Sequence, residues 1–440
     1  MTRADRRLLG GRSPAAFLRR YWQKRPLLIR GAVPGFRDPL SPDQLAGLAC
    51  GENVESRLVL VRGGTRPFQV LPGPQDPRRL RALPPTHWTL LVQGVDRHLP
   101  AVAGLRERFR FVPDWRIDDV MVSFAPRFGT VGPHVDSYDV FLLQGLGRRR
   151  WRIQRRPDPA LRPGLDLRVL RYFRPDAEWL LEPGDLLYLP PGVAHQGVAL
   201  EDGLTYSIGF RAPAHADLLA AALTGCLRAI PPSRLYADPD LRPTWQPGEI
   251  GRRALTRMRS LVRHQLRRLD GRAFDRCLGE RLTEPLDGGP TPRARRLSPE
   301  ALGRRLTSGA GLVRSPASRI AFVRRTTGVD LFVDGQLLPL PRRLAFAAPL
   351  LTGRAPPRPR GPRAPPGPAR LRRPARRPRQ AWRVRGWPPL TCRAARTRRK
   401  SSGRGLSITR RPPVTGWGSS RRIAWSISRG TSTPGGTRPP

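Results

Sequence analysis

Residues 132–153, "GPHVDSYDVFLLQGLGRRRWRI", place a histidine and a carboxylate two positions apart and end in four arginines interleaved with Trp151 and Ile153. In an extended strand, residues i and i+2 project from the same face, so His134 and Asp136 can reach one point. Taken alone, such a pair more often has a structural or accidental role than a metal-binding one. Its significance depends on what the rest of the chain supplies.

A third metal ligand is available in "LPPGVAHQGVAL", residues 189–200, where His195 follows a Pro-Gly turn and opens another strand. Two imidazoles and one carboxylate on one face of an ion, with the other positions open, are typical of non-haem iron(II) oxygenases. The open positions admit a bidentate cosubstrate together with dioxygen. The sequence therefore predicts an Fe(II) site formed by His134, Asp136 and His195, which are also the predicted catalytic residues.

Strand alternation in "RRRWRI" groups Arg149 with Trp151 and Ile153 on the apolar, inward face. A buried guanidinium is costly unless it meets an anion, and a carboxylate is its natural bidentate partner. This favours a site for the far carboxylate of 2-oxoglutarate, although an internal ion pair with an aspartate or glutamate is an open alternative. In "DDVMVSFA", residues 118–125, alternation turns Ser123 inward as a second donor to the same carboxylate.

The hydrophobic pattern changes along the chain. Residues 14–70 predict mixed helices and strands, and residues 88–212 contain many short apolar runs separated by Pro, Gly and Asp, which indicate an all-β sandwich or barrel. Residues 214–282 have helical apolar spacing with arginines between, and a short helix-then-strand module follows from about residue 295. The expected fold class is α+β.

The chain of 440 residues is long enough for two or three domains and has a formal net charge of +48. Four cysteines lie scattered without a CxxC pair, which indicates a reducing compartment and no structural zinc site: Cys50, Cys226, Cys277 and Cys392. The amino terminus lacks a signal-peptide core and no apolar run is long enough to cross a bilayer, so we expect no membrane association and a cytoplasmic location.

The last ninety residues differ from the rest of the chain. Residues 351–440 contain 24 of the 81 lysines and arginines, 16 prolines and no acidic residue, and they show no apolar periodicity. Such a segment cannot build a core. It is either a disordered basic tail that binds RNA or the product of a GC-rich gene translated out of frame, and the abrupt change of composition favours the second.

Five blocks, in order along the chain, resemble the JmjC-type bacterial ribosomal oxygenases of the cupin superfamily, which are ribosomal protein arginine 3-hydroxylases. The blocks are "YWQKRPLLIRGAV", "WTLLVQGVD", "GPHVDSYDVFLLQGLGRRRWRI", "GDLLYLPPGVAHQGVAL" and "YSIGFRAP". The resemblance implies a double-stranded β-helix (jelly-roll) that holds Fe(II) through His134, Asp136 and His195 and binds 2-oxoglutarate through Arg149 and Ser123.

The resemblance also implies an order of domains. An oxygenase domain with N-terminal α/β elements is expected over residues 1–212, a helical dimerisation region over 213–288 and a partial winged-helix module over 289–352. Residues 353–440 form the low-complexity tail, which is expected to be disordered or out of frame. The family pattern does not continue past about residue 352.

The predicted function is Fe(II)- and 2-oxoglutarate-dependent hydroxylation of an arginine in a large-subunit ribosomal protein, with dioxygen as the oxidant. A homodimer and a contact with ribosomal RNA are the other predicted interactions. Four residues near the motif could face a basic substrate, although a structural role is favoured for each: Tyr138, Asp118, Asp119 and Asp139. Two alternatives stay open: a cupin metal enzyme that does not use 2-oxoglutarate, and a basic RNA- or ribosome-binding protein with a vestigial metal site.

Overall fold

The computed structural model describes residues 3–64, 67–228, 230–243, 245–267, 271–285, 298–308 and 314–353. All of them belong to one compact unit, Met1–Arg373. Apart from Gly353, the predicted tail lies outside the described residues.

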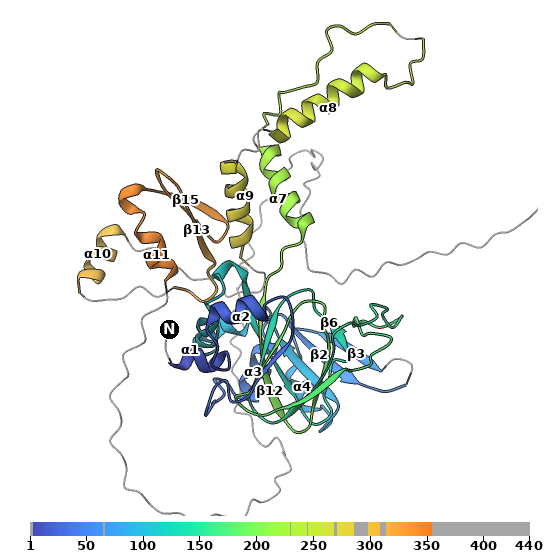
Figure 1. The fold of residues 1–440 in the computed structure, drawn as a ribbon, viewed down its shortest axis with the longest axis vertical. Helices are drawn as coiled ribbons and strands as arrows, with labels where there is room; N and C mark the ends of the chain where they lie inside the picture. The colour runs from blue at the N-terminus through green and yellow to red at the C-terminus, as the bar shows by residue number, and fades with distance from the viewer. Residues whose placement is uncertain are drawn as a thin grey trace, which may run out of the picture. The chain divides into compact units, whose positions relative to one another are not determined.

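The larger sheet of residues 1–212 has eight antiparallel strands in the order β1-β10-β7-β12-β5-β4-β2-β3. Its strands are β1 (Leu27–Ile29), β2 (Ser56–Val61), β3 (Phe68–Pro72), β4 (Trp88–Val92), β5 (Ile117–Ala125), β7 (Val140–Gln144), β10 (Leu186–Leu189) and β12 (Gly203–Phe210). The central strands are buried on both faces, as all eight residues of β12 are. A smaller sheet packs against one face of this sheet, and the strands of both sheets make up the blue-to-green part of Figure 1.

The smaller sheet has the order β6-β11-β8-β9, again antiparallel. Its strands are β6 (His134–Val135), β8 (Arg149–Gln154), β9 (Ala177–Leu181) and β11 (Ala194–Ala199). The buried residues of β8 alternate with partly exposed ones, which confirms the predicted inward face. Apolar side chains from both sheets meet in one cluster that includes Leu142, Trp151 and Leu187. The two sheets therefore enclose a common interior, and the prediction of a β-rich barrel is confirmed.

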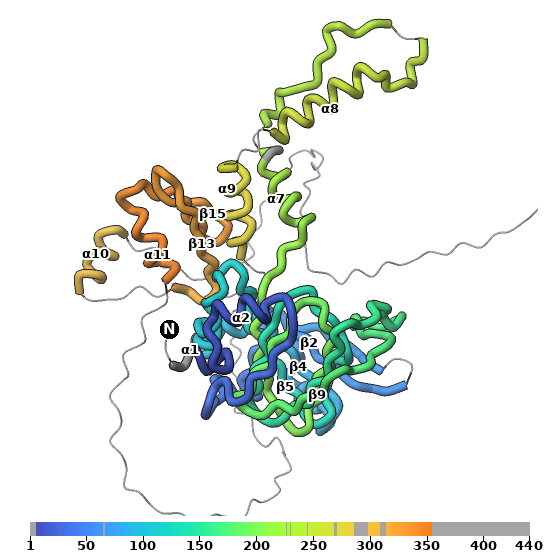
Figure 2. The backbone as a smooth tube through the Cα atoms, in the orientation of Figure 1, coloured from blue at the N-terminus to red at the C-terminus, as the bar shows by residue number. Residues whose placement is uncertain are grey.

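Helices cover the other face of the larger sheet. They are α1 (Arg3–Leu8), α2 (Pro14–Arg20), α3 (Pro42–Ala49), α4 (Pro77–Arg81), α5 (Val95–His98), α6 (Pro100–Arg106), and the 3-10 turns η1 (Glu107–Phe109) and η2 (Asp114–Arg116). Ser13 and Ser41 cap α2 and α3, and Ser41 forms a full capping box with Gln44. Phe17 packs on Phe141 and Tyr188 of the sheet. Figure 2 shows α1 and α2, in dark blue, beside the green strands of the barrel.

Three helices follow the barrel: α7 (His215–Arg228), α8 (Arg252–Arg267) and α9 (Gly271–Thr283). Their helical character confirms the sequence prediction, but the apolar pattern of residues 252–282 is divided between α8 and α9, with residues 268–270 outside the described residues. None of the described helices is long and apolar enough to span a membrane. The dimerisation role of this region is not tested by the fold and stays a prediction.

The last described part contains α10 (Pro299–Thr307), a three-stranded antiparallel sheet in the order β13-β14-β15, the 3-10 turn η3 (Arg342–Leu344) and α11 (Ala347–Thr352). The strands are β13 (Ile320–Arg324), β14 (Gly328–Val333) and β15 (Gln336–Pro341). Ala348 of α11 packs on Val329 and Leu331 of the sheet. The predicted helix-then-strand order is confirmed, and the winged-helix assignment stays a prediction.

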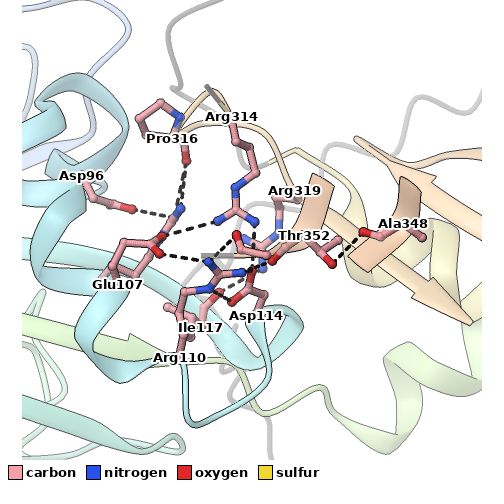
Figure 3. A network of polar contacts seen from close by, with 12 residues as sticks. Asp96, Glu107, Arg110, Asp114, Ile117, Arg314, Pro316, Arg319, Ala348 and Thr352 are labelled. Atoms are coloured by element: carbon pink, nitrogen blue, oxygen red, sulfur yellow. Dashed lines mark hydrogen bonds and ion pairs between the residues drawn. The ribbon is translucent and has the colours of Figure 1, made fainter. Parts of the chain in front are cut away.

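Ion pairs and hydrogen bonds join this last part to the segment around the start of β5 (Figure 3). Arg314 pairs with Asp114 at 2.9 Å, and Arg319 donates to the carbonyl of Ile117 at 3.2 Å. Arg110 pairs with Asp114 and also donates to the carbonyl of Thr352. Residues 200 or more positions apart in the chain are thus held together next to the start of β5.

Candidate active site

The structure brings the three predicted metal ligands together at one end of the barrel. His134 lies on β6 and is the register partner of His195 on β11, while Asp136 directly follows β6. The two imidazole rings have centroids 4.3 Å apart. Among the described residues this is the group of His, Cys, Asp or Glu side chains that could hold a metal, with ligand atoms within 4.8 Å of one another.

Hydrogen bonds from the local backbone orient both imidazoles. Nδ1 of His134 lies 3.1 Å from the carbonyl oxygen of Gly132, and Nδ1 of His195 lies 3.1 Å from that of Val193. A carbonyl can only accept, so each Nδ1 carries the proton and each Nε2 keeps a lone pair. Burial, and then the neighbouring His134, lower the pKa of His195 to about 4, which keeps this imidazole neutral.

These donors fit a divalent transition metal. Nε2 of His134 and of His195 lie 4.0 Å and 3.6 Å from the two carboxylate oxygens of Asp136. Atoms bound at about 2 Å from a shared ion lie no more than about 4 Å apart, so only small side-chain movements are required. Two nitrogens and one oxygen from one side of the ion leave the opposite coordination positions open.

The inward position of Arg149 is also as predicted. Its side chain is 6% exposed, and its Nη1 donates to Ser123 Oγ at 3.2 Å and to Thr205 Oγ1 at 3.0 Å. Burial lowers the pKa of Arg149 to about 10, so the guanidinium stays charged at neutral pH. No carboxylate of the described residues pairs with it, which argues against the internal ion pair. An uncompensated buried cation is therefore available for an anionic ligand.

Thr205 is a site residue that the sequence analysis did not identify. It lies on β12, in register with Ser123 on β5 and Gln144 on β7, and its hydroxyl donates to Gln144 Oε1 at 3.1 Å. Small polar residues, Thr205 and Ser207, alternate with large apolar ones in "GLTYSIGF". This alternation could have indicated Thr205 as a site residue, because a strand buried on both faces can turn its small polar side chains only toward a polar interior.

Register places the metal ligands and the guanidinium on one inner surface. On β8, Ile153 is the partner of His195, Trp151 of Gly197 and Arg149 of Ala199. The Arg149 guanidinium carbon lies 5.4 Å from the centroid of the Trp151 ring, and that ring lies 5.8 Å from the His195 ring. The indole of Trp151 thus lies between the Arg149 guanidinium and the His195 imidazole.

The four candidate substrate residues separate into two kinds. Asp139 is fully buried and accepts hydrogen bonds from Tyr188 at 2.6 Å and Gln23 at 2.9 Å, so its role is structural. Asp118 accepts from Arg211 Nε at 2.8 Å and is structurally paired as well.

Asp119 and Tyr138 lie beside each other at Gly209 of β12. A Cβ added to Gly209 would lie 3.6 Å from Asp119 Oδ1 and 4.0 Å from Tyr138 Cε2, so both side chains border the space at this residue. Oδ2 of Asp119 accepts from the Gly94 amide at 2.7 Å, while no described residue hydrogen-bonds its Oδ1. Burial, and then the Asp118 and Asp96 carboxylates, raise the pKa of Asp119 to about 7.

Comparison with known proteins gives the class of the domain and then the family. A JmjC domain profile matches residues 104–218, which contain the whole ligand set. The fold is accordingly of the JmjC and cupin type. The chain is 37% identical, over 76% of its own length and 87% of the relative's, to "Ribosomal protein uL16 3-hydroxylase" of Escherichia coli strain K12. It is also 37% identical to "Probable ribosomal oxygenase" of Haemophilus influenzae, over 52% of this chain and 55% of that one.

Solved structures agree. YcfD, a ribosomal oxygenase from Escherichia coli, in complex with cobalt and 2-oxoglutarate superposes with a TM-score of 0.64 at 36% identity, covering 76% of this chain and 87% of that chain. The complex of YcfD with cobalt and succinic acid gives the same values. The chain therefore belongs to the JmjC-domain ribosomal oxygenases. It is a 2-oxoglutarate-dependent oxygenase, and Fe(II), 2-oxoglutarate and dioxygen are the cofactor set of this class, as predicted.

Proposed function

We propose that this protein hydroxylates an arginine of a large-subunit ribosomal protein, with Fe(II) held by His134, Asp136 and His195. Arg149 and Ser123 bind the far carboxylate of 2-oxoglutarate. The single observation that carries this proposal is the uncompensated Arg149 guanidinium, which faces the same enclosed interior as the two imidazoles. A metal enzyme of the cupin type that uses no dicarboxylate cosubstrate would have no need of this buried cation.

Bound iron, with 2-oxoglutarate and dioxygen, supplies the oxidising power needed to hydroxylate an unactivated carbon. The chain supplies orientation. Backbone carbonyls fix the tautomers of both imidazoles, and Ser123 and Thr205 hold the Arg149 guanidinium in place before the cosubstrate binds. The closely packed apolar cluster around Trp151 excludes water from the space between the Arg149 guanidinium and the two imidazoles.

The proposed substrate follows from the relative that is named for ribosomal protein uL16. A target arginine requires an acidic partner near the metal, and Asp119 provides an oxygen that no described residue hydrogen-bonds. A guanidinium bound there would relieve the repulsion between Asp119 and its acidic neighbours. We therefore assign Asp119, and Tyr138 beside it, to the pocket of the target side chain.

The test uses the purified protein with uL16, Fe(II), 2-oxoglutarate and oxygen. We expect a mass gain of about 16 Da on one arginine of uL16, coupled to release of an equal amount of succinate. Asp136→Ala serves as the matched control, because it removes a metal ligand and should abolish both products. Turnover without succinate would support the cupin alternative, and unmodified uL16 with an inert metal site would support the RNA-binding alternative.

The proposal includes self-association through the helical region. Leu219, Leu223 and Leu227 follow one another at a spacing of four residues on α7 and are 60%, 38% and 69% exposed. Apolar side chains of α8 are exposed too: Met258, Leu261, Val262 and Leu266. A regular apolar face that no described residue covers supports a homodimer, because a water-exposed stripe of this kind is unfavourable.

The remaining parts of the proposal concern the ribosome. The arginines of α8 would contact ribosomal RNA. Residues 289–352 would form a partial winged-helix module. The reaction would take place in the cytoplasm, where ribosomal proteins are made. The arginine content of α8 supports the RNA contact through phosphate neutralisation. A steep loss of ribosomal RNA affinity with added salt would test it.

A further inference from the structure

Two unpaired hydrogen-bond donors lie on β8, two residues apart and on the same face. Arg149 Nε and Trp151 Nε1 are both buried, and neither has a hydrogen-bond partner in the described residues. Buried indole N–H groups nearly always find an acceptor, and guanidinium N–H groups do so even more consistently. Two neighbouring exceptions on one inward face indicate an acceptor that the protein itself does not supply.

The two side chains pack over the same residue. A Cβ added to Gly197 would lie 2.8 Å from Trp151 Cη2, 2.9 Å from Trp151 Cζ2 and 3.0 Å from Arg149 Nε. The six-membered ring of the indole and the Nε of the guanidinium therefore both lie against the Gly197 backbone, and Nε1 is bonded to the ring carbon next to Cζ2. The absence of a side chain at this residue is what allows both groups to lie there.

The other contacts of Arg149 leave this side of the guanidinium available. Its Nη1 is directed to Ser123 and Thr205 on the larger sheet. A carboxylate has two oxygens and several lone pairs, so it can accept from Arg149 Nε and from a second donor at once. Trp151 is 6% exposed, which means that bulk water cannot serve as its usual acceptor.

We propose that Trp151 Nε1–H, together with Arg149 Nε–H, donates a hydrogen bond to the far carboxylate of 2-oxoglutarate. Trp151 is then a cosubstrate-binding residue and not only part of the apolar cluster. This inference rests on the proposed function, since it requires that 2-oxoglutarate binds beside Arg149. It also gives a physical reason for a tryptophan at this position, where a phenylalanine would fill much of the same space.

The first test observes the indole directly. In the Zn(II)-loaded, 15N-labelled protein, the indole N–H resonance of Trp151, identified by its absence in Trp151→Phe, should move downfield when succinate or 2-oxoglutarate is added. Trp179 is the register partner of Trp151 on β9 and packs against the same cluster, so its indole resonance is the internal control. An unmoved Trp151 resonance at saturating 2-oxoglutarate would overturn the inference.

The second test measures affinity by calorimetry. Trp151→Phe should weaken 2-oxoglutarate binding about tenfold or more, the loss expected for one hydrogen bond to a charged group. Trp179→Phe should change it little. Pyruvate, which has no far carboxylate, should bind the wild type and Trp151→Phe equally. Equal weakening of pyruvate and 2-oxoglutarate would contradict the assignment and indicate a packing effect.

The two proposals fail in different ways. If 2-oxoglutarate does not bind the wild-type protein at all, or binds Arg149→Ala equally well, then the proposed cosubstrate site is wrong. If binding depends on Arg149 but neither the Trp151 resonance nor the affinity of Trp151→Phe changes, only the role of Trp151 is wrong.

Discussion

Individual residues of the barrel interior show what strand alternation can and cannot reveal. The inward positions of Arg149 and Ser123 follow from local sequence, because each lies two positions from an apolar neighbour on the same face. The approach of His195 to His134 does not follow locally, since it depends on the pairing of β6 with β11. Thr205 was not predicted because its strand is buried on both faces.

The buried guanidinium gives a prediction with opposite effects on stability and binding. Arg149→Met removes an uncompensated charge while keeping much of the side-chain length, so the ligand-free protein should become more stable by about 1–3 kcal/mol. The affinity for 2-oxoglutarate should fall about a hundredfold or more. Thermal unfolding and calorimetry measure the two effects. A variant that loses stability would show that the cation already has a partner.

Gly197 should be intolerant of even one methyl group. In Gly197→Ala the new Cβ would lie 2.8 Å from Trp151 Cη2, closer than real Cβ contacts, and 3.0 Å from Arg149 Nε, which is tighter than most of them. We expect a loss of about 1–3 kcal/mol in stability and weaker 2-oxoglutarate binding. Gly104→Ala on α6 is the matched control, since an added Cβ there meets nothing within 4 Å. Equal behaviour of the two variants would mean that the interior adapts.

Asp119 gives a prediction about pH. It must be ionised to bind a guanidinium, and burial together with Asp118 and Asp96 raises its pKa to about 7, against the opposing effect of Arg97. The affinity of metal-free protein for a uL16 peptide with the target arginine should therefore fall as the pH is lowered through about 7. Fluorescence anisotropy between pH 8 and pH 6 measures this. Asp119→Asn should bind weakly and without this dependence, and a parallel slope in the variant would assign the effect to another group.

Secondary-structure elements were predicted best where a cap or a strict alternation marks them. Ser13 and Ser41 cap α2 and α3 in the stretch predicted as mixed helices and strands, and the strands from β4 to β12 lie within the predicted region of short apolar runs. β9 was not predicted, because its five residues include the exposed Glu178 and only Leu181 is fully buried. Apolar residues keep a helical spacing, with arginines between them, through residues 252–282. The sequence therefore did not indicate that this stretch divides into α8 and α9.

The leucine stripe of α7 gives a prediction about assembly. Replacing Leu219 and Leu227 together by glutamate places charges on the apolar face, which should convert a dimer into a monomer without loss of helix content. Light scattering after size-exclusion chromatography and circular dichroism measure the two properties. Leu235→Glu is the control, because Leu235 is 81% exposed but lies outside the helices. A wild-type protein that is already monomeric at micromolar concentration would contradict the assignment.

At the scale of the whole molecule, long-range ion pairs join segments that the sequence gives no reason to connect. Asp114 accepts hydrogen bonds from Arg110, four residues ahead of it, and from Arg314, two hundred residues away (Figure 3). Arg319 reaches the backbone of β5 only two residues before Asp119. Charge pairs of this kind leave no periodic pattern, which is why the order of segments was predicted but their contacts were not. The contacts bring the last described part of the chain to the strand that carries Ser123.

This ion-pair network predicts an acid-sensitive contribution to stability. Burial alone would raise the pKa of Asp114, but hydrogen bonds from Arg110 and Arg314 hold it below its usual value. A carboxyl whose folded-state pKa is lowered stabilises the protein above its unfolded pKa, about 4, and this contribution is lost as the pH falls through the lowered value. Asp114→Asn should therefore cost about 1–3 kcal/mol at pH 7, because two partly buried guanidinium groups each lose one of their two anionic partners and keep only Glu107.

The difference in unfolding free energy between Asp114→Asn and the wild type should shrink as the pH falls from about 4, where the unfolded carboxyl takes up its proton, through the lowered pKa of the folded state. Urea unfolding at pH 7, 5 and 3 measures this difference. Asp176→Asn is the matched control, because its pair with Arg155 is well exposed and should contribute little at any pH. A cost for Asp114→Asn that is independent of pH would mean that Asp114 acts through packing and hydrogen-bond shape rather than through its charge, and the electrostatic account of this junction would then be wrong.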